Sequence, residues 1–376
     1  MVSRSDEGLN RIFDELADTL NISETMRDKA ERAYRALGDW LGKNSEGKEV
    51  QVYTQGSFAL GTVVRPPSGE DLDYDIDLVC ELPDMTLDTA RNIKWFVGNR
   101  IGEHATYAAK LEPEGKRCWT LDYGDFHVDV LPCTGDVQRG GTAIRLTHKD
   151  RATGRYENRY SDPRGYAKWF EGQMGESLLE AKRKRLGAVF CSVDDVPTFA
   201  VRTPLQKSVQ ILKHHRNVMF EGLDDAPISI IISTLAAQAY DGEGGTYDAV
   251  IGILDRMSFY IQGNAGAYRI PNPVDEKENF ADRWNEEPGR ARAFFAWLQQ
   301  AQEDFYTLSS IHGLDEIGRA LESSCGKIVA TRTMNAYGEG FQEARNTGEL
   351  FAASAGLTFS GSPATTVVPR HEFYGD

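Results

Sequence analysis

Aspartate occupies every second position from Asp73 to Asp77, and this spacing is the feature of the sequence best suited to chemistry. Alternate side chains of a β-strand project from the same face, so the carboxylates would lie together while Tyr74 and Ile76 point into a core. Like charges held this close repel one another unless a cation lies between them. Mg²⁺ prefers hard oxygen ligands and usually keeps positions open for water and phosphate. The spacing therefore predicts a divalent-metal site on a strand.

A second segment, from Phe126 to Leu131, has the same alternation. Its apolar residues share one face, whereas His127 and Asp129 share the other. We expect this strand to lie beside the first, which would add Asp129 to the acidic row. Three carboxylates can hold two metal ions roughly 3.5–4 Å apart, the arrangement that supports in-line phosphoryl transfer. His127 by itself is more typical of a structural or solvent-facing histidine.

Gly56 and Ser57 precede the acidic row at a predicted turn between a strand and a helix. Glycine permits close backbone approach, and a helix start that carries a hydroxyl is suited to phosphate. A Gly-Ser pair alone is common in turns. Here the serine lies 18 residues before Asp75, and a third aspartate follows on a later strand. This ordered set is much more specific, and it indicates a phosphoryl-transfer site.

Hydrophobic periodicity predicts the elements that must position these residues. The first 42 residues have apolar side chains at helical spacing, while strand-like alternation is concentrated between residues 49 and 131. The remainder is mostly helical. This order predicts an α+β lobe followed by a helical lobe, with the site in the cleft between them. The later helices are expected at 163–186, 203–220, 227–241, 245–260 and 288–306.

Composition restricts the class of protein. The chain has 376 residues, 40% of them hydrophobic, which supplies a sizeable core and excludes an intrinsically disordered chain. Lys and Arg number 42 against 57 Asp and Glu, and the net charge of −15 disfavours a protein that grips long nucleic acid. Five scattered cysteines give no disulfide or zinc framework, and no apolar run reaches the length of a membrane helix. We therefore expect a cytoplasmic protein that requires neither a membrane nor long nucleic acid.

Three stretches together resemble a known family. They are YTQGSFALGTVVRP at 53–66, DYDIDLVC at 73–80 and FHVDVLP at 126–132. With them the chain resembles the DNA polymerase β nucleotidyltransferase superfamily and, more closely, the bacterial cGAS/DncV-like nucleotidyltransferases, the CD-NTases of CBASS anti-phage signalling. The similarity continues at 203–220, 228–236 and 272–284, and so covers most of the chain from about residue 50 to residue 300.

The resemblance implies a bilobed α+β fold, with a mixed sheet and an N-terminal spine helix in one lobe and a helical C-terminal lobe that closes the cleft. On this basis we expect a nucleotidyltransferase core at 1–165, a helical lobe at 166–356 and a tail at 357–376. Some members of the family are regulated by enzymes that act on this end. The last residues, Phe373–Asp376, are therefore a candidate docking or conjugation site for a regulatory partner.

The resemblance also implies roles for the acids. Asp75 and Asp77 match the first two metal-binding carboxylates of the family, and Asp129 matches the third. Together they would hold two Mg²⁺ ions, for which Mn²⁺ is the alternative, and they would be the catalytic residues. Asp73 lies in the same phase, so Asp73/Asp75 is the other register. The Leu-Val-Cys sequence that follows Asp77 favours Asp75/Asp77.

Four residues are expected to bind the triphosphate. Gly56 and Ser57 match the Gly-Ser motif that holds the donor triphosphate, and Lys207 matches a helical lysine that reaches back to it. Lys207 also lies in a basic segment, and a lysine suits phosphate as a point charge. Ser229 matches the serine paired with that lysine, and this expectation rests on the resemblance alone.

The activity that the resemblance implies is the joining of NTPs, ATP among them, into a cyclic di- or oligonucleotide with release of pyrophosphate. A separate effector would read this second messenger. The alternative is a nucleotidyltransferase that modifies an RNA, a protein or a small molecule. A nonenzymatic nucleotide binder is a third class. The complete set of carboxylates with Gly-Ser argues against it, because a binder has no need of the metal set.

Overall fold

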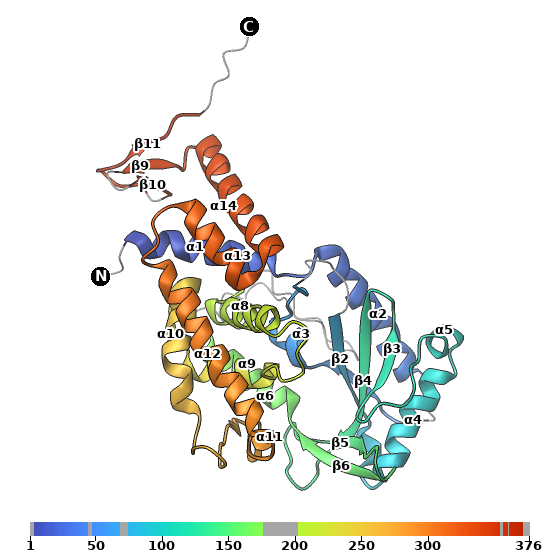
Figure 1. Cartoon of the computed structure of the whole chain (residues 1–376). Coiled ribbons are helices and arrows are strands. Elements are labelled where there is room, and N and C mark those ends of the chain that lie inside the picture. Colours follow the sequence, from blue (N-terminus) through green and yellow to red (C-terminus); the bar gives the residue numbers. More distant parts are fainter. Residues whose placement is uncertain are drawn as a thin grey trace.

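Two hydrophobic cores divide the chain into a sheet lobe and a helical lobe, which lie side by side in Figure 1. The computed structural model describes residues 4–43, 47–67, 74–175, 202–353, 356–359 and 361–370. Asp73 lies outside the described residues, and so does the alternative register Asp73/Asp75. Phe373–Asp376 and the second half of the helix expected at 163–186 also lie outside them. The α+β class and the two-lobe arrangement expected from the sequence are confirmed.

A mixed sheet forms the centre of the sheet lobe. Its strand order is β1-β2-β4-β5-β6, with β3 paired to β4. The β2–β4 pair is parallel and the other pairs are antiparallel, so the two acidic segments become neighbours. The strands are β1 (Gln51–Thr54), β2 (Tyr74–Glu81), β3 (Trp119–Asp122), β4 (Phe126–Gly135), β5 (Ile144–Lys149) and β6 (Tyr156–Ser161).

The two faces of β2 and β4 differ as the alternation predicts. Tyr74, Ile76 and Leu78 are buried with Phe126, Val128 and Val130 of β4 in one core. Helices α2 (Glu24–Gly42) and α4 (Ala90–Gly102) contribute to this core. Burial of each large apolar side chain stabilises the fold by about 1.5–3 kcal/mol, and a slip of one residue would expose the whole set. The core face therefore fixes the aspartates on the opposite face, toward the helical lobe.

The first two helices belong to different cores. α1 (Arg4–Thr19) packs into the helical lobe, where the ring of Phe13 meets two aromatic rings edge-on. The helix then breaks, and α2 starts at Glu24, with the hydroxyl of Ser23 accepting the N–H of Met26. The nucleotidyltransferase core expected at 1–165 places both of these helices in the same lobe as the sheet. The structure differs because the apolar face of α1 is buried among helices, whereas that of α2 is buried on the sheet.

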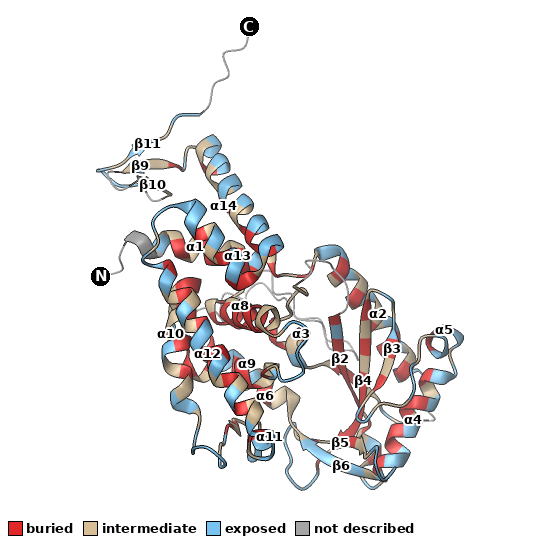
Figure 2. Ribbon diagram, viewed as in Figure 1, coloured by how far each residue is buried: buried red, intermediate tan, exposed pale blue. Residues whose placement is uncertain are grey.

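Helix α8 (Pro204–Met219) runs through the middle of the helical lobe and is largely buried (Figure 2). A capping box starts it, in which the Thr203 hydroxyl accepts the N–H of Gln206 and the Gln206 side chain accepts the N–H of Thr203. Its central position matters because it carries charged side chains into the interior. The helices around it include α6 (Pro163–Gln173), α9 (Ser229–Ala239), α10 (Thr246–Arg256), α12 (Pro288–Leu308), α13 (Leu314–Cys325) and α14 (Lys327–Thr347).

Part of the expected tail forms a small sheet. Strand β9 (Phe351–Ala353) pairs with both β10 (Gly356–Thr358) and β11 (Thr366–Val367). Phe359 follows β10, and the guanidinium of Arg11 lies 3.2 Å from the centroid of its ring. The boundary expected between residues 356 and 357 therefore falls inside this sheet, which contacts α1 through Arg11.

The described residues also address two expectations from composition. No helix among them combines the length and the apolarity needed to cross a bilayer. Four cysteines lie in the described part of the chain, and all four are free thiols. The short elements that remain include α3 (Gly56–Leu60), α5 (Ala105–Ala108), β7 (Pro271–Asn272), β8 (Asp275–Asn279) and α11 (Asp282–Glu286).

Candidate active site

Two neighbouring strands present the acids. β2 and β4 pair in a register that sets Asp77 beside Asp129 and Asp75 beside His127. This confirms the predicted pairing of the two acidic strands. Asp75 is the most open of these side chains, with 71% of its surface exposed, whereas Asp77 and Asp129 are partly buried.

Asp77 is the most crowded of the acids. Burial, together with the charges of Asp129 and Asp75, raises the pKa of Asp77 to about 7, while Lys213 acts in the opposite direction. Carboxylates at this density favour a cation between them. Among the described residues, no group of three or more Asp, Glu, His or Cys side chains is already placed to hold a metal ion. The donor set fits an open Mg²⁺ site that water and phosphate oxygens complete.

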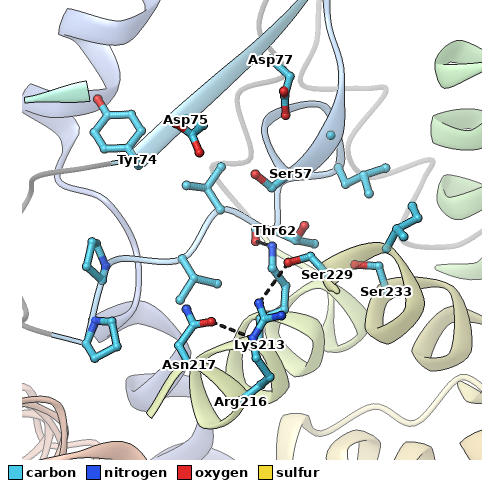
Figure 3. A pocket seen from close by; sticks show the side chains of 17 residues that line it. Ser57, Thr62, Tyr74, Asp75, Asp77, Lys213, Arg216, Asn217, Ser229 and Ser233 are labelled. Carbon is cyan, nitrogen blue, oxygen red and sulfur yellow. Dashed lines mark hydrogen bonds between the residues drawn. The ribbon is translucent and has the colours of Figure 1, made fainter. Parts of the chain in front are cut away.

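The turn at Gly56 brings the backbone onto Asp77. The N–H of Gln55 donates to the Asp77 carbonyl at 2.9 Å, and Gly56 then takes a φ of +62° at the start of α3. A Cβ at this position would lie 2.6 Å from Oδ2 of Asp77. Both the positive φ and the lack of space therefore require glycine. The next residue, Ser57, lines the cavity in front of the acids (Figure 3).

Lys213 brings a positive charge from helix α8 to the same cavity. The residue is 7% exposed, and its ammonium donates to the Thr62 carbonyl at 2.9 Å. Burial and the charge of Arg216 lower the pKa of Lys213 to about 7, and Asp77 opposes this shift. The aspartates of the sheet lobe and the ammonium of the helical lobe thus line one cavity (Figure 3).

Arg216 lies nearly one turn further along α8 and connects it to α9. Its guanidinium donates to Oγ of Ser229 at 3.0 Å, to the side-chain oxygen of Asn217 at 2.8 Å and to the Pro227 carbonyl. Burial lowers the pKa of Arg216 to about 10. Ser229, which was expected at the site from the resemblance, lines the cavity beside this arginine.

Lys207, in contrast, lies away from the acids. Its ammonium is 2.8 Å from the carboxylate of Asp14 on α1, and it does not line the cavity. Six residues separate it from Lys213, and at about 100° per residue this places the two side chains on different faces of α8. The fold therefore brings Lys213 to the site and leaves Lys207 to join α8 to α1. The missed signal was the pair Lys213 and Arg216, which are three residues apart and therefore lie on nearly the same face of the helix.

Two adjoining cavities lie along this face of the sheet. The first, of about 480 Å³, is lined by the acids of β2 and the cations of α8. The second, of about 910 Å³, shares Gly56, Leu60 and Ile230 with the first and extends to β5, β6 and the β7–β8 hairpin. Arg139 there binds Asp275 and so joins the two lobes. The cationic residues of this second cavity are Arg117, Arg139, Arg159, Lys277, Arg283 and Arg290.

The fold brings together paired acids on a mixed sheet, a Gly-Ser turn against them and cations from a helical lobe. Residues 8–173 match the family model described as the Second Messenger Oligonucleotide or Dinucleotide Synthetase domain. Over these residues the chain is similar to this synthetase domain.

Individual relatives extend the likeness over nearly the whole chain. A protein of Roseivirga ehrenbergii named c-di-GMP synthase is 28% identical over 368 residues, which cover 96% of both chains. The structure of CdnG from Bradyrhizobium diazoefficiens in complex with GTP has a TM-score of 0.69 at 20% identity, covering 88% of this chain and 99% of that one. DncV of Vibrio cholerae, a cyclic AMP-GMP synthase, has a TM-score of 0.55 at 15% identity, covering 88% and 90%. At these identities the two solved structures establish the shared fold.

Proposed function

We propose that this protein is a divalent-metal-dependent synthase that joins two nucleoside triphosphates into a cyclic dinucleotide and releases pyrophosphate. One observation carries the proposal: acids on one lobe and buried cations on the other line a single cavity. A metal–triphosphate complex has the matching charges, with its cation toward the acids and its phosphates toward Lys213 and Arg216. The match to the synthetase family supports the same reaction.

Asp75, Asp77 and Asp129 are the proposed metal-binding residues. When bound, two Mg²⁺ ions, or Mn²⁺ in their place, would supply charge neutralisation at the phosphates and acidify the attacking hydroxyl. The raised pKa of Asp77 supports this assignment. The repulsion that keeps a proton on Asp77 equally favours a divalent cation beside it.

The donor triphosphate is proposed to lie between the Gly56 turn and helix α8. Ser57 offers a hydroxyl donor on one side, and Lys213 offers a point charge on the other. With a pKa of about 7, Lys213 is only partly protonated near neutral pH. The negative charge of an adjacent triphosphate favours its protonated form. Arg216 holds the hydroxyl of Ser229 at the cavity wall. These residues hold the α-phosphate before the acids, and positioning of this kind provides much of the catalysis in phosphoryl transfer.

The second nucleotide is proposed to occupy the neighbouring cavity, where its phosphates would face a wall with several cationic side chains. Its ribose hydroxyl attacks the donor α-phosphate in line, a new P–O bond forms, and the bond to the departing pyrophosphate breaks. Asp129 lies two residues from Leu131, which lines the second cavity, and is the proposed acceptor of the hydroxyl proton. A second transfer in the opposite sense, in which the free ribose hydroxyl attacks the remaining α-phosphate, closes the ring and releases a second pyrophosphate.

GTP is the substrate that we propose first, because a relative is named c-di-GMP synthase and the CdnG structure contains GTP. ATP, expected from the sequence, is the other candidate. Following the family resemblance, we propose that the product acts in the cytoplasm as a second messenger in anti-phage defence, where a separate effector reads it. We keep the C-terminal end as the proposed contact for a regulatory partner.

A product assay tests the proposed function. Purified protein is incubated with each NTP, alone and in pairs, in the presence of Mg²⁺ or Mn²⁺, and the phosphatase-treated products are identified by mass spectrometry. We expect a phosphatase-resistant cyclic dinucleotide that GTP alone suffices to form. The Asp75→Ala/Asp77→Ala variant, shown to be folded by circular dichroism, should form none. A nucleotide attached to an added RNA or protein, with no cyclic species from NTPs alone, would refute the proposal.

A further inference from the structure

A third strand adds polar side chains to the acidic face. β3 pairs with β4 in a register that sets Thr120 beside Asp129 and Asp122 beside His127. Since β2 pairs with the other edge of β4, the register forms a cross-sheet row that runs from Thr120 through Asp129 to Asp77. Thr120 therefore flanks the acids on the side opposite β2.

Thr120 makes a short hydrogen bond to Asp129. Its Oγ1 lies 2.5 Å from Oδ1 of Asp129, and the hydroxyl donates because an ionised carboxylate can only accept. Hydrogen bonds to ionised groups are shorter and stronger than those between neutral groups. The β-branched side chain of threonine is also restricted at χ1, which limits the positions of this donor. This hydrogen bond holds one oxygen of the Asp129 carboxylate.

Cys118 extends this contact away from the acids. Its Sγ lies 3.7 Å from Oγ1 of Thr120. Burial raises the pKa of the Cys118 thiol to about 11, so the group is a protonated, weak donor at neutral pH. Because Thr120 gives its single proton to Asp129, its oxygen can accept from the thiol. Cys118 is therefore a second polar neighbour of the Thr120–Asp129 pair.

We propose that Thr120 is a positioning residue that fixes the carboxylate of Asp129 for cation binding and for the nucleotidyl transfer. The role in nucleotidyl transfer rests on the proposed function. The choice of Thr120 as the positioning residue rests on its observed hydrogen bond to Asp129. Thr120 lines neither cavity described above and so acts through Asp129. Removal of a group that hydrogen-bonds a metal ligand typically lowers metal affinity or activity about ten- to hundredfold.

Three matched variants test the contribution of the Thr120 hydroxyl. Thr120→Val removes it and keeps the shape of the side chain, whereas Thr120→Ser keeps it. Thr134→Val is the control, since it removes a strand hydroxyl on β4 that donates to the Leu82 carbonyl instead of to an acid. Binding of Mn²⁺ is measured without nucleotide by electron paramagnetic resonance of the free ion at pH 8. Turnover with NTPs is measured separately, and thermal unfolding reports the stability of each variant.

We expect Thr120→Val to raise the dissociation constant of Mn²⁺ about ten- to hundredfold and to lower kcat with little change in the KM for NTP. Thr120→Ser should stay within about threefold of the wild type because it retains the donor, and Thr134→Val should match the wild type. Wild-type Mn²⁺ affinity and kcat in Thr120→Val would overturn the inference. An equal loss in Thr134→Val or Thr120→Ser would also overturn it.

The two readouts separate this inference from the proposed function. If the wild-type protein forms no nucleotide product but the Mn²⁺ affinities follow the expected order, the proposed reaction fails and the positioning role stands. If the protein forms the cyclic product and Thr120→Val binds Mn²⁺ and turns over as the wild type does, the reaction stands and the positioning role fails.

Discussion

The two lobes bring charge to the cleft in opposite ways. The acids of the sheet lobe stand on strands, where pairing determines their neighbours, and one of them, Asp75, is open to solvent. The cations of the helical lobe stand on helix α8 and are buried. Backbone carbonyls hold them, that of Thr62 for Lys213 and that of Pro227 for Arg216.

This difference shows that each lobe holds ionisable groups whose charge is not compensated within that lobe. Burial and the neighbouring acids raise the pKa of Asp77 to about 7, and burial lowers the pKa of Lys213 to about 7. In both cases the folded protein disfavours the charged form of the side chain. A ligand that brings a cation to the acids and phosphates to the ammonium relieves both. Changes in the two lobes should therefore have opposite electrostatic consequences.

The largest expected effect on activity comes from Asp77→Asn. Turnover should fall roughly a thousandfold or more, because the amide lacks the charge that holds the cation. The free energy of unfolding of the metal-free variant should rise at pH 8. The folded pKa of Asp77, about 7, lies above its ordinary value of 3.8, so ionisation opposes folding as the pH rises through this window. We expect a gain of about 1–3 kcal/mol, measured by urea unfolding.

Asp241→Asn is the matched control, since Asp241 is an exposed acid that follows α9. It should alter neither turnover nor stability at pH 8. The comparison should also depend on pH: at pH 4 most of the Asp77 carboxyls are protonated, and the gain of Asp77→Asn over the wild type should vanish. A gain that is the same at both pH values would contradict the electrostatic explanation.

The placement of the acids could be predicted from the sequence because a strand has a period of two. Once Tyr74, Ile76 and Leu78 are assigned to a core, Asp75 and Asp77 must share the opposite face. The two-lobe order followed from the change in periodicity along the chain. The position of α1 in the helical core could not be predicted in this way, because an apolar helix face is equally able to cover a sheet or a helix bundle.

The second prediction compares two lysines on the same helix. Lys213→Met should lower kcat/KM roughly a hundredfold, because the charge that faces the triphosphate is lost while the packing of the aliphatic chain is retained. Lys207→Met should leave kcat/KM within about threefold and destabilise the protein by about 0.5–1 kcal/mol, since its partly exposed ion pair with Asp14 is lost. Steady-state kinetics and urea unfolding measure both. Equal kinetic losses in the two variants would contradict the assignment.

Sequence reasoning selected helix α8 but chose Lys207, a lysine that does not line the cavity, and the reason is physical. A basic segment suggests phosphate, but the face of a helix that meets the site depends on packing against several other helices. Lys213 is buried, and the pattern alone gives no reason to prefer a buried lysine over an exposed one. The interaction between Arg216 and Ser229 joins two helices that are separate in the sequence. Thr120 was missed because its role depends on the pairing of β3 with β4.

The third prediction tests how closely the Gly56 turn approaches the acids. Gly56→Ala should lower turnover roughly thirtyfold, because it combines a strained φ of +62° with a Cβ only 2.6 Å from Oδ2 of Asp77. Gly222→Ala is the matched control, since Gly222 has a φ of +75° and nothing within 4 Å of an added Cβ. It should cost stability, measured by thermal unfolding, without loss of turnover. If both variants lose turnover alike, backbone strain alone explains the effect.

The smallest expected effect is a change of about tenfold per pH unit in the affinity for Mn²⁺ below the pKa of Asp77. Burial and the neighbouring acids set this pKa to about 7. At a lower pH, Asp77 must lose a proton before the cation binds. The affinity for Mn²⁺ should therefore rise from pH 6 to pH 7 and level off near pH 8. Lys213 loses its charge in the same range, which adds to the rise because a cation beside the site is removed. Electron paramagnetic resonance of free Mn²⁺, recorded without nucleotide, measures the profile. Lys213→Met should keep most of the slope if Asp77 dominates, whereas a flat profile in Lys213→Met would show that the helical lobe controls the pH dependence.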